Sequence, residues 1–451
     1  MRHMNTQFRL ALILACLPSA ARAELPTIDG VFSDWGEQYS VASDEQGDAI
    51  ASFDLSKVSA VTNGSELYVH FDIGSEINLQ SGIESDGTLR LEIALPRRQE
   101  LTIDFRKRTA ISSADPNQSI PWSELGFACL PTFASERYEL RLDLQMFNVQ
   151  PDDRIQLNFS GSDQLDQAVS IVLQKRHPRS LKSTFAKSDT SNFRIANLNT
   201  LRQGMSNNDR SGSIKRLLAA AKADIFCFQE EWDETAFRKA AAQIVPTEGQ
   251  VNLHWSNGCG IASSLPLEPI AMELDRCAAA IIELPNSKPL VVISVHLKCC
   301  GFTGSREDLA RVQQAKQLAA GIQKIRNREA SRELADAGVV VIGDYNLVGS
   351  RKPLDILETA GLSELLLLGV DKRAAFTWRG LRKEESFWPG RLDLVTYDHA
   401  TLRPAGGFLI DTSSLSKKSL RDLRLLAHDS EASDHLMMVA DFHVRSVNPS
   451  Q

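Results

Sequence analysis

The sequence has 451 residues, of which 43% are hydrophobic and 24% are charged, and its net charge is −7. A chain of this length and composition can bury more than one core, so we expect a globular protein of two domains. The charge is unevenly placed, because residues 24 to 175 hold 25 acidic and 11 basic side chains, a net charge of −14. This acidic half would repel phosphate backbones and anionic membrane surfaces, so we do not expect it to bind nucleic acid.

The first residues are typical of a secretory signal. Arg2 and Arg9 precede an apolar run over residues 10 to 17, and Ala21-Arg22-Ala23 follows it. This pattern predicts a signal peptide over residues 1 to 23 and a periplasmic or secreted protein. Neither this run nor any later one is long enough to span a bilayer, so we expect no transmembrane segment.

The cysteines are interpreted in the light of export, because oxidising compartments permit disulfides. Those remaining after cleavage are Cys129, Cys227, Cys259, Cys277, Cys299 and Cys300. They lack the paired C-x-x-C spacing of structural zinc sites. Residues 260 to 265, 277 to 284 and 290 to 297 are typical of three successive strands. A meander of these strands would bring Cys277 beside the end of the third, which predicts a disulfide from Cys277 to Cys299 or Cys300.

The acidic half, residues 24 to 174, has the pattern of an all-β sandwich. Short segments alternate apolar with polar residues, as in Glu66-Leu-Tyr-Val-His-Phe-Asp72 and Thr88-Leu-Arg-Leu-Glu-Ile-Ala94. The opening from Ile28 to Trp35, followed by Glu66-Leu67-Tyr68-Val69, resembles the start of family 9 carbohydrate-binding modules. The resemblance allows a glycan as partner, and the acidity favours a sugar or a cation such as Ca²⁺. Trp35 would serve either as a core aromatic or as a sugar platform.

A polar stretch without apolar periodicity, residues 175 to 192, is typical of a linker. Beyond it, residues 193 to 445 alternate short apolar runs with helical patterns, which predicts an α/β domain. One helix should start near Ser213, and Ser305 should cap a longer one that runs toward Ile325.

Polar residues accompany the apolar strands of this second half. Val339-Val-Val-Ile-Gly343 is typical of a buried strand and is followed by Asp344 and Asn346. The alternation of strand side chains would point both toward one wall. Other predicted strands carry further polar groups at their ends: Asn199, Gln229-Glu230, His296, Asp393 and Ser433-Asp434-His435. Open α/β sheets keep their chemistry at such positions.

These motifs, together with Gly260-Ile261-Ala262-Ser263-Ser264, resemble in their order the endonuclease/exonuclease/phosphatase superfamily, which has the DNase I-like fold. The resemblance implies a four-layered sandwich, in which two β-sheets pack face to face with helices outside. It also implies hydrolysis of phosphate esters with Mg²⁺ or Mn²⁺.

The residue types suit this chemistry, since a phosphoester needs a cation on its oxygens, an activated water and a proton donor. Glu230 is the predicted metal ligand, with Asn199 beside it and Asp434 as a further ligand; oxygen ligands favour Mg²⁺. His435 would act on the phosphate, and the resemblance pairs it with Asp393.

Three further residues complete the predicted catalytic set. Asp344 and Asn346 would hold the nucleophile and the phosphoryl group, and His296 would supply a second imidazole. Either Asp344 or His435 could take the proton of the attacking water.

Candidate substrate contacts are less specific. Arg391 would bind phosphate or brace a loop, and Trp378 would stack on a base or sugar or pack internally. Lys417 and Lys418 open a basic stretch that ends at Arg424 and forms either a groove for a phosphate backbone or a solvated helix. The leading hypothesis is an exported phosphodiesterase acting on nucleic acid. Its alternatives are a phosphatase or phosphodiesterase for small phosphorylated molecules or lipid headgroups, and a glycan-binding protein with an inactive second domain.

Overall fold

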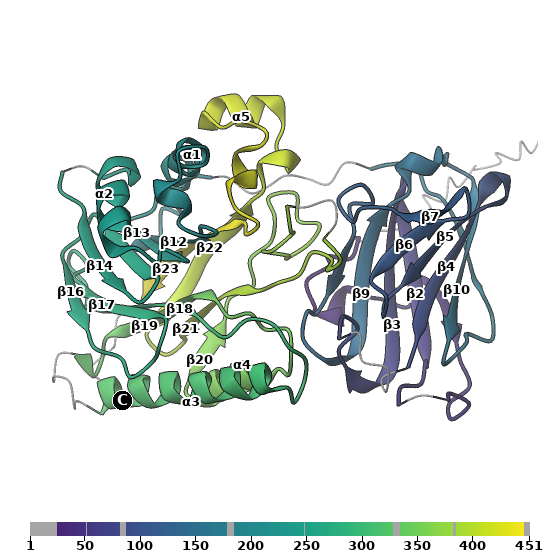
Figure 1. Ribbon diagram of the computed structural model, residues 1–451, viewed down its shortest axis with the longest axis horizontal. Helices are drawn as coiled ribbons and strands as arrows, with labels where there is room; N and C mark the ends of the chain where they lie inside the picture. The colour runs from purple at the N-terminus through teal and green to yellow at the C-terminus, as the bar shows by residue number, and fades with distance from the viewer. Residues whose placement is uncertain are drawn as a thin grey trace, which may run out of the picture.

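The computed structural model describes residues 25–50, 52–81, 87–177, 185–247, 249–327, 334–381 and 385–445. The chain divides into a β-sandwich and an α/β half (Figure 1). The predicted signal peptide lies outside the described residues, as do residues 178–184 of the predicted linker.

The sandwich consists of a five-stranded sheet, ordered β1-β2-β3-β9-β8, and a six-stranded sheet, ordered β11-β10-β4-β5-β6-β7. Its strands are β1 (Ser40–Ser43), β2 (Lys57–Asn63), β3 (Glu66–Ile77), β4 (Leu89–Leu95), β5 (Gln99–Asp104), β6 (Thr109–Ser112), β7 (Asp115–Ser119), β8 (Ala128–Leu130), β9 (Ser135–Asp143), β10 (Arg154–Gly161) and β11 (Val169–Val172). Neighbouring strands pair antiparallel.

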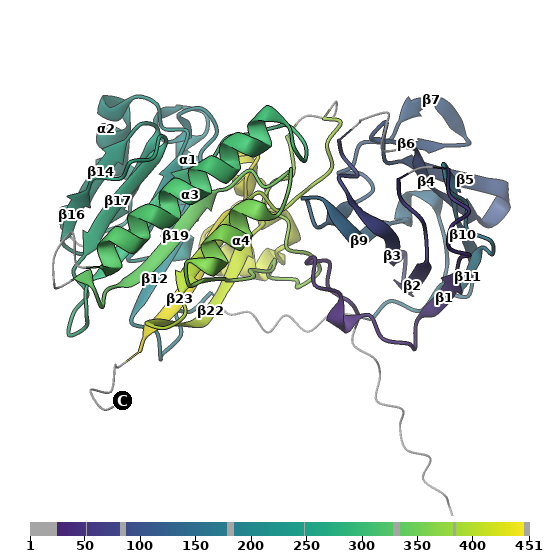
Figure 2. The same ribbon diagram turned by 90° about the horizontal axis from the view of Figure 1, so that it is seen from below.

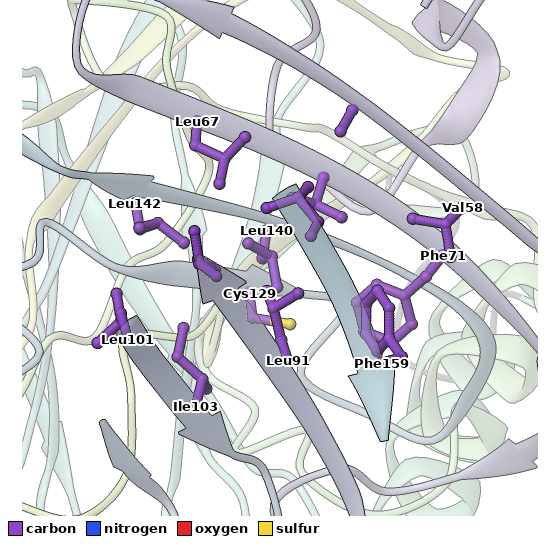
Figure 3. Packing of buried hydrophobic residues seen from close by; sticks show 14 of the residues in the cluster. Val58, Leu67, Phe71, Leu91, Leu101, Ile103, Cys129, Leu140, Leu142 and Phe159 are labelled. Carbon is purple, nitrogen blue, oxygen red and sulfur yellow. The ribbon is translucent and has the colours of Figure 1, made fainter. Parts of the chain in front are cut away.

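The core of the sandwich follows from the alternation in its strands. In β4, Leu89, Leu91, Ile93 and Leu95 are buried while the residues between them are not. Figure 3 shows Leu91 and residues of other strands, such as Phe71, filling the space between the sheets. Each such side chain contributes about 1.5–3 kcal/mol when fully buried. The predicted all-β sandwich is confirmed.

The second half contains two six-stranded sheets, ordered β14-β15-β13-β12-β23-β22 and β16-β17-β18-β19-β21-β20. Their strands are β12 (Phe193–Asn199), β13 (Ile225–Gln229), β14 (Asn252–Ser256), β15 (Cys259–Ser263), β16 (Leu267–Ile270), β17 (Cys277–Ile282), β18 (Leu290–His296), β19 (Gly338–Asp344), β20 (Leu362–Glu364), β21 (Asp393–Asp398), β22 (Leu402–Ile410) and β23 (Met437–Val444). The helices are α1 (Ser211–Ala221), α2 (Glu234–Ile244), α3 (Arg306–Arg326), α4 (Lys352–Thr359) and α5 (Lys417–Leu423).

These elements form four layers. Apolar residues from both sheets, such as Ile195 and Val292, share one core. Residues of α1 and α2 pack on the outer face of the first sheet, and residues of α3 and α4 pack on the outer face of the second. Figure 2 shows α3 and α4 lying across the sheet that contains β19. The predicted four-layered sandwich is therefore confirmed. Ser305 caps α3, as expected, by accepting a hydrogen bond from the amide of Asp308.

The two halves are joined by more than the connecting segment. Trp388, which belongs to the second half in sequence, is 2% exposed and packs in the core of the sandwich against Phe105, Trp122 and Phe127. The carbonyl of Phe185, within the predicted linker, accepts a hydrogen bond from Arg194 of β12. The linker thus ends on the surface of the second half.

The predicted disulfide is wrong in this structure. Cys277 is a free, buried thiol that lies opposite Val295 in the β17–β18 pair. Its side chain belongs to the core beneath α3 and α4, whereas Cys299 and Cys300 follow the end of β18. The predicted meander also fails at its first strand, because β15 belongs to the other sheet.

No helix among the described residues is both long enough and apolar enough to cross a membrane.

Candidate active site

Strand register places three of the predicted catalytic residues side by side. His296 ends β18 and lies opposite Asp344, which ends the parallel strand β19. Asp344 in turn lies opposite Asp393, which begins the antiparallel strand β21. One edge of the second sheet therefore presents an imidazole and two carboxylates at the same level, and all three side chains are buried.

Gly343 makes this close approach possible. Its φ of +150° lies outside the range of ordinary side-chain-bearing residues, and a Cβ atom there would stand 2.1 Å from the carbonyl oxygen of Val295. A larger residue would push β18 and β19 apart next to His296 and Asp344. The glycine before the predicted catalytic aspartate is thus explained by packing.

The first sheet adds Asn199 and Glu230 from the ends of β12 and β13. Nδ2 of Asn199 donates to Oδ2 of Asp344 over 3.1 Å and to Oε1 of Glu230 over 3.2 Å. Glu230 has a φ of +63°, which is uncommon for a residue with a side chain, and its Oε2 accepts the amide of Arg202. Strained conformations of this kind cluster at functional sites.

The residues on either side of Glu230 have different environments from it. Gln229 is buried and donates to Asn197 in its own sheet and to Ser294 in the facing sheet. Glu231 is fully buried and accepts hydrogen bonds from the Thr200 hydroxyl and the Met205 amide. Burial raises the pKa of Glu231 to about 6. Of the two adjacent acids, only Glu230 is partly exposed to solvent.

His435 is held by its neighbours on both sides. The Ser433 hydroxyl donates to the carbonyl of Asn199 and accepts the amide of His435. Nδ1 of His435 lies 2.7 Å from Oδ2 of Asp393. Burial alone would lower the pKa of His435, but the carboxylates of Asp393 and Asp344 raise it to about 10. The ring is therefore an imidazolium at neutral pH, with Nε2 facing the site.

The centre of the site is Oδ2 of Asp344. Besides Asn199, it lies 3.6 Å from Nε2 of His296 and 3.8 Å from Nε2 of His435. Burial raises the pKa of Asp344 to about 7 and lowers that of His296 to about 4, so the His296 imidazole is neutral. A neutral imidazole and an imidazolium thus both lie within 4 Å of Oδ2 of the Asp344 carboxyl group, which titrates near neutral pH.

The donors also fit a divalent cation. Asp344, Asp393 and His435 form a candidate metal cluster with ligand atoms within 4.8 Å of one another. Glu230 adds a hard donor from the facing sheet, and oxygen-rich sets of this kind suit Mg²⁺ or Mn²⁺. His435 and Asp393 already satisfy each other, and the Asn199 oxygen accepts the Leu201 amide, so the oxygens of Glu230 and Asp344 are the better candidates.

Two other predicted residues lie next to this centre. Asp434 has Oδ1 3.9 Å from Nε2 of His435, while its Oδ2 accepts a hydrogen bond from Nε1 of Trp378. Trp378 is thus tied to the site, although it is half-buried and its indole N–H is already used. Asn346 has a φ of +49°, so the expected strand alternation has ended there. Its amide donates to Asp344 and its Nδ2 to the carbonyl of Leu297.

The remaining predicted substrate contacts are not brought into the site. Arg391 forms an ion pair with Glu364 over 2.7 Å, which fits the loop-bracing alternative, and phosphate binding by Arg391 stays a prediction. Lys417 and Lys418 lie exposed on α5, and Lys418 pairs with Asp422. Within the described residues, no hydrogen bond or ion pair links either lysine to the catalytic cluster.

Sequence reasoning missed an aromatic residue at the mouth of the site. Trp232 is 39% exposed, and its ring centroid lies 5.9 Å from that of His296. The guanidinium of Arg276 lies over the same ring at 5.1 Å, and no carboxylate partner is found for it in the described part of the chain. The position of Trp232, two residues after Glu230, was the signal that could have revealed it.

Comparison with known proteins concerns this half of the chain. A model of the Endonuclease/Exonuclease/phosphatase family matches residues 196–435, more than half of the chain. No curated protein matches the chain.

Solved structures align with the same half. The 3'-5' exonuclease NExo of Neisseria meningitidis is 20% identical, with a TM-score of 0.40, and the alignment covers 55% of this chain and 99% of that one. TDP2 of D. rerio, complexed with a single-strand DNA product, is 18% identical, with a TM-score of 0.40 and coverage of 55% and 98%. A variant of the beta toxin of Staphylococcus aureus with bound magnesium ions is 16% identical, with a TM-score of 0.37 and coverage of 55% and 99%.

Proposed function

Because the chain belongs to the endonuclease/exonuclease/phosphatase family, whose members hydrolyse phosphate esters, we propose that it is an exported phosphodiesterase that works with Mg²⁺ or Mn²⁺. One observation carries the proposal: Asn199, His296 and His435 converge on Oδ2 of Asp344. A phosphoryl group or water placed there would meet hydrogen-bond donors, a carboxylate and a cation at once.

The residues divide the chemistry among themselves. Water held against Asp344 attacks phosphorus, and its proton passes to a carboxylate or imidazole of the site. A new P–O bond forms as the bond to the leaving oxygen breaks. His435, charged and oriented by Asp393, stabilises the added negative charge on the phosphoryl oxygens. His296, on the neighbouring strand, is placed to donate a hydrogen bond to a phosphoryl or leaving oxygen.

Glu230 and Asp344 would hold the cation, with Asn199 and Asp434 as further ligands. Bound there, the cation supplies charge neutralisation for the phosphoryl oxygens. Glu230 fits this role because it is the accessible acid of the Glu230–Glu231 pair, and its backbone is held in an unusual conformation that aims the carboxylate toward Asn199.

We infer that nucleic acid is the leading substrate. Trp232 and Arg276 support this inference, since an exposed indole can stack on a base and a guanidinium without a carboxylate partner can bind a phosphate. Base stacking on an aromatic ring contributes about 1–3 kcal/mol. The resemblance of the sandwich to carbohydrate-binding modules, and with it a glycan or Ca²⁺ partner, stays a prediction.

Hydrolysis of bis(p-nitrophenyl) phosphate by Asp344→Asn tests the assignment of the site. We expect a loss of turnover on the order of 10³-fold, because the central carboxylate is removed. Asp398→Asn is the matched control, since Asp398 is a buried aspartate at the other end of β21, paired with Arg326. Wild-type turnover by Asp344→Asn would overturn the proposal.

A further inference from the structure

The sandwich contacts the loops that leave the active-site strands. Asn78, which follows β3, is 6% exposed and belongs to the sandwich by sequence. Its Nδ2 donates to the carbonyl of Val348 over 2.9 Å, in the loop that follows Asp344 and Asn346. Its Oδ1 accepts the amide and the hydroxyl of Thr303 over 2.9 and 2.7 Å, in the loop that follows His296. One buried amide therefore ties two catalytic loops together.

A second contact holds the segment that leads into Asp393. Oγ1 of Thr132 accepts the amide of Arg391 over 2.7 Å, two residues before Asp393. The chain approaches this closely because residue 390 is glycine, where a Cβ atom would stand 2.9 Å from Oγ1 of Thr132. On the other side, the hydroxyl of Thr377 accepts the amides of Leu392 and Asp393.

The same loop is anchored along both of its arms. The second arm carries Trp388, whose ring is buried in the sandwich core and whose amide donates to Gln80. The first arm pairs with the N-terminal segment of the sandwich, since the amide of Ala375 donates to the carbonyl of Ile28.

The loop that carries Trp388 also contacts His435 directly. Its two arms pair through Trp378 and Gly390, with 2.9 Å hydrogen bonds in both directions. Trp378 also forms a bridge with His435. The sandwich, the loop, Asp393 and His435 thus form one continuous set of contacts. Figure 1 shows the loops before β21 extending toward β9 of the sandwich.

We propose that the sandwich is a structural part of the active site, with Asn78 and Thr132 as positioning residues for His296, Asp344 and Asp393. The inference rests on the proposed function and gives the sandwich a role beyond any ligand of its own. A displacement of about 1 Å in a catalytic group can cost about 100-fold in rate, so cross-domain hydrogen bonds at these loops can control turnover.

Thr132→Val in the full-length mature protein tests this role, with Thr132→Ser as the conservative variant. Valine keeps the shape but removes the acceptor for the Arg391 amide, whereas serine keeps it. Asn78→Asp removes the donor to Val348 in the same way. The matched control is Thr62→Val, because Thr62 is a buried threonine that accepts a backbone amide from Gln174 entirely within the sandwich.

For each variant we would measure kcat and KM on bis(p-nitrophenyl) phosphate and the downfield proton resonance of the His435–Asp393 hydrogen bond. The melting temperature of each variant would be measured alongside, to show any general destabilisation. We expect Thr132→Val and Asn78→Asp to lower kcat about 10-fold or more with little change in KM. Thr132→Val should also shift or broaden the proton resonance. Thr132→Ser and Thr62→Val should retain both the kcat and the resonance of the wild type.

Wild-type kcat and an unchanged resonance in Thr132→Val and Asn78→Asp would overturn the positioning role. An equal loss of kcat in Thr62→Val would also overturn it, since the effect would then follow general destabilisation. A wild-type protein without turnover would instead contradict the proposed function, and the proton resonance would still test the positioning role by itself.

Discussion

Nδ1 of His435 lies 2.7 Å from Oδ2 of Asp393, and both side chains are buried. The carboxylate orients the imidazole and helps to keep it charged, against the opposing effect of burial. Asp393→Asn would remove that charge while keeping the shape of the side chain.

We expect Asp393→Asn to lower kcat by about 10²–10⁴-fold. It should also move the alkaline limb of the pH profile to lower pH. The sign follows from the pKa of His435, which neighbouring carboxylates raise to about 10 and which must fall when one of them is neutralised. Profiles of kcat/KM between pH 5 and pH 10 provide the test, and an alkaline limb that stays in place would contradict the pairing.

Glu230 and Glu231 make a matched pair of adjacent acids. Glu230→Gln should reduce activity at least 100-fold and raise the Mg²⁺ concentration needed for half-maximal rate, with little change in melting temperature. Glu231→Ala should lower the melting temperature, because it removes the buried oxygen that accepts hydrogen bonds from the Thr200 hydroxyl and the Met205 amide. Metal titrations and thermal melts of both variants separate the two roles. Full activity in Glu230→Gln at low Mg²⁺ would contradict its assignment.

Trp232 should distinguish long substrates from small ones. Trp232→Ala should raise KM for an oligonucleotide about 5- to 100-fold, in line with about 1–3 kcal/mol of stacking, and leave bis(p-nitrophenyl) phosphate nearly unaffected. Trp232→Phe keeps an aromatic face and should recover much of the affinity. Equal effects of Trp232→Ala on both substrates would point to a structural role beside His296.

The cysteines give a direct chemical test of the fold. Cys300 is exposed and Cys299 is half-buried, whereas Cys129, Cys227, Cys259 and Cys277 are buried. Iodoacetamide should therefore modify the Cys299-Cys300 segment in the native protein and the other four only after denaturation. Peptide mass mapping under non-reducing conditions measures this. A peptide in which Cys277 is cross-linked to either cysteine of that segment would contradict the structure.

Glu139 should make the stability of the sandwich depend on pH. It is fully buried, it accepts hydrogen bonds from Asp29, Gly30 and Trp35, and burial raises its pKa to about 8. Because its pKa is higher in the folded chain than the ordinary value of 4.5, its stabilising contribution is complete below pH 4.5 and is lost as pH rises through 8.

Glu139→Gln removes this titration. The melting temperature of the wild type should therefore fall more steeply between pH 5 and pH 9 than that of the variant. The comparison uses the slope of melting temperature against pH, because a destabilisation by the glutamine that is the same at every pH does not change that slope. Parallel slopes would contradict the raised pKa.

Local patterns were sufficient to predict much of this molecule. The β-branched run before Gly343 predicted the buried strand β19, and Ser305 predicted the start of α3; each of these signals lies within a few residues of the feature that it specifies. The four layers were implied by the family resemblance that the order of the strand-end motifs carries, and the family match covers the same half of the chain.

The features that were missed depend on contacts between distant parts of the chain. Trp388 lies in the sandwich core 266 residues after its neighbour Trp122, and no local periodicity indicates that a residue of the second half packs there. Arg391 has its partner Glu364 on β20, a pairing that no local pattern indicates. Cys277 lies near the end of β18, as the β17–β18 pairing predicted, but its side chain belongs to the core beneath α3 and α4. Tertiary packing decided each of these cases.

The most direct test of the account is Mg²⁺-dependent hydrolysis of plasmid DNA, RNA and bis(p-nitrophenyl) phosphate by the mature protein, side by side. EDTA and His435→Ala serve as controls. We expect cleavage of all three substrates, abolished by EDTA and reduced at least 100-fold by His435→Ala. Cleavage of the small diester alone would retain the phosphodiesterase and reject nucleic acid as its substrate. Turnover that persists in EDTA or in His435→Ala would contradict the central claim that this metal-assisted histidine site cleaves phosphodiesters.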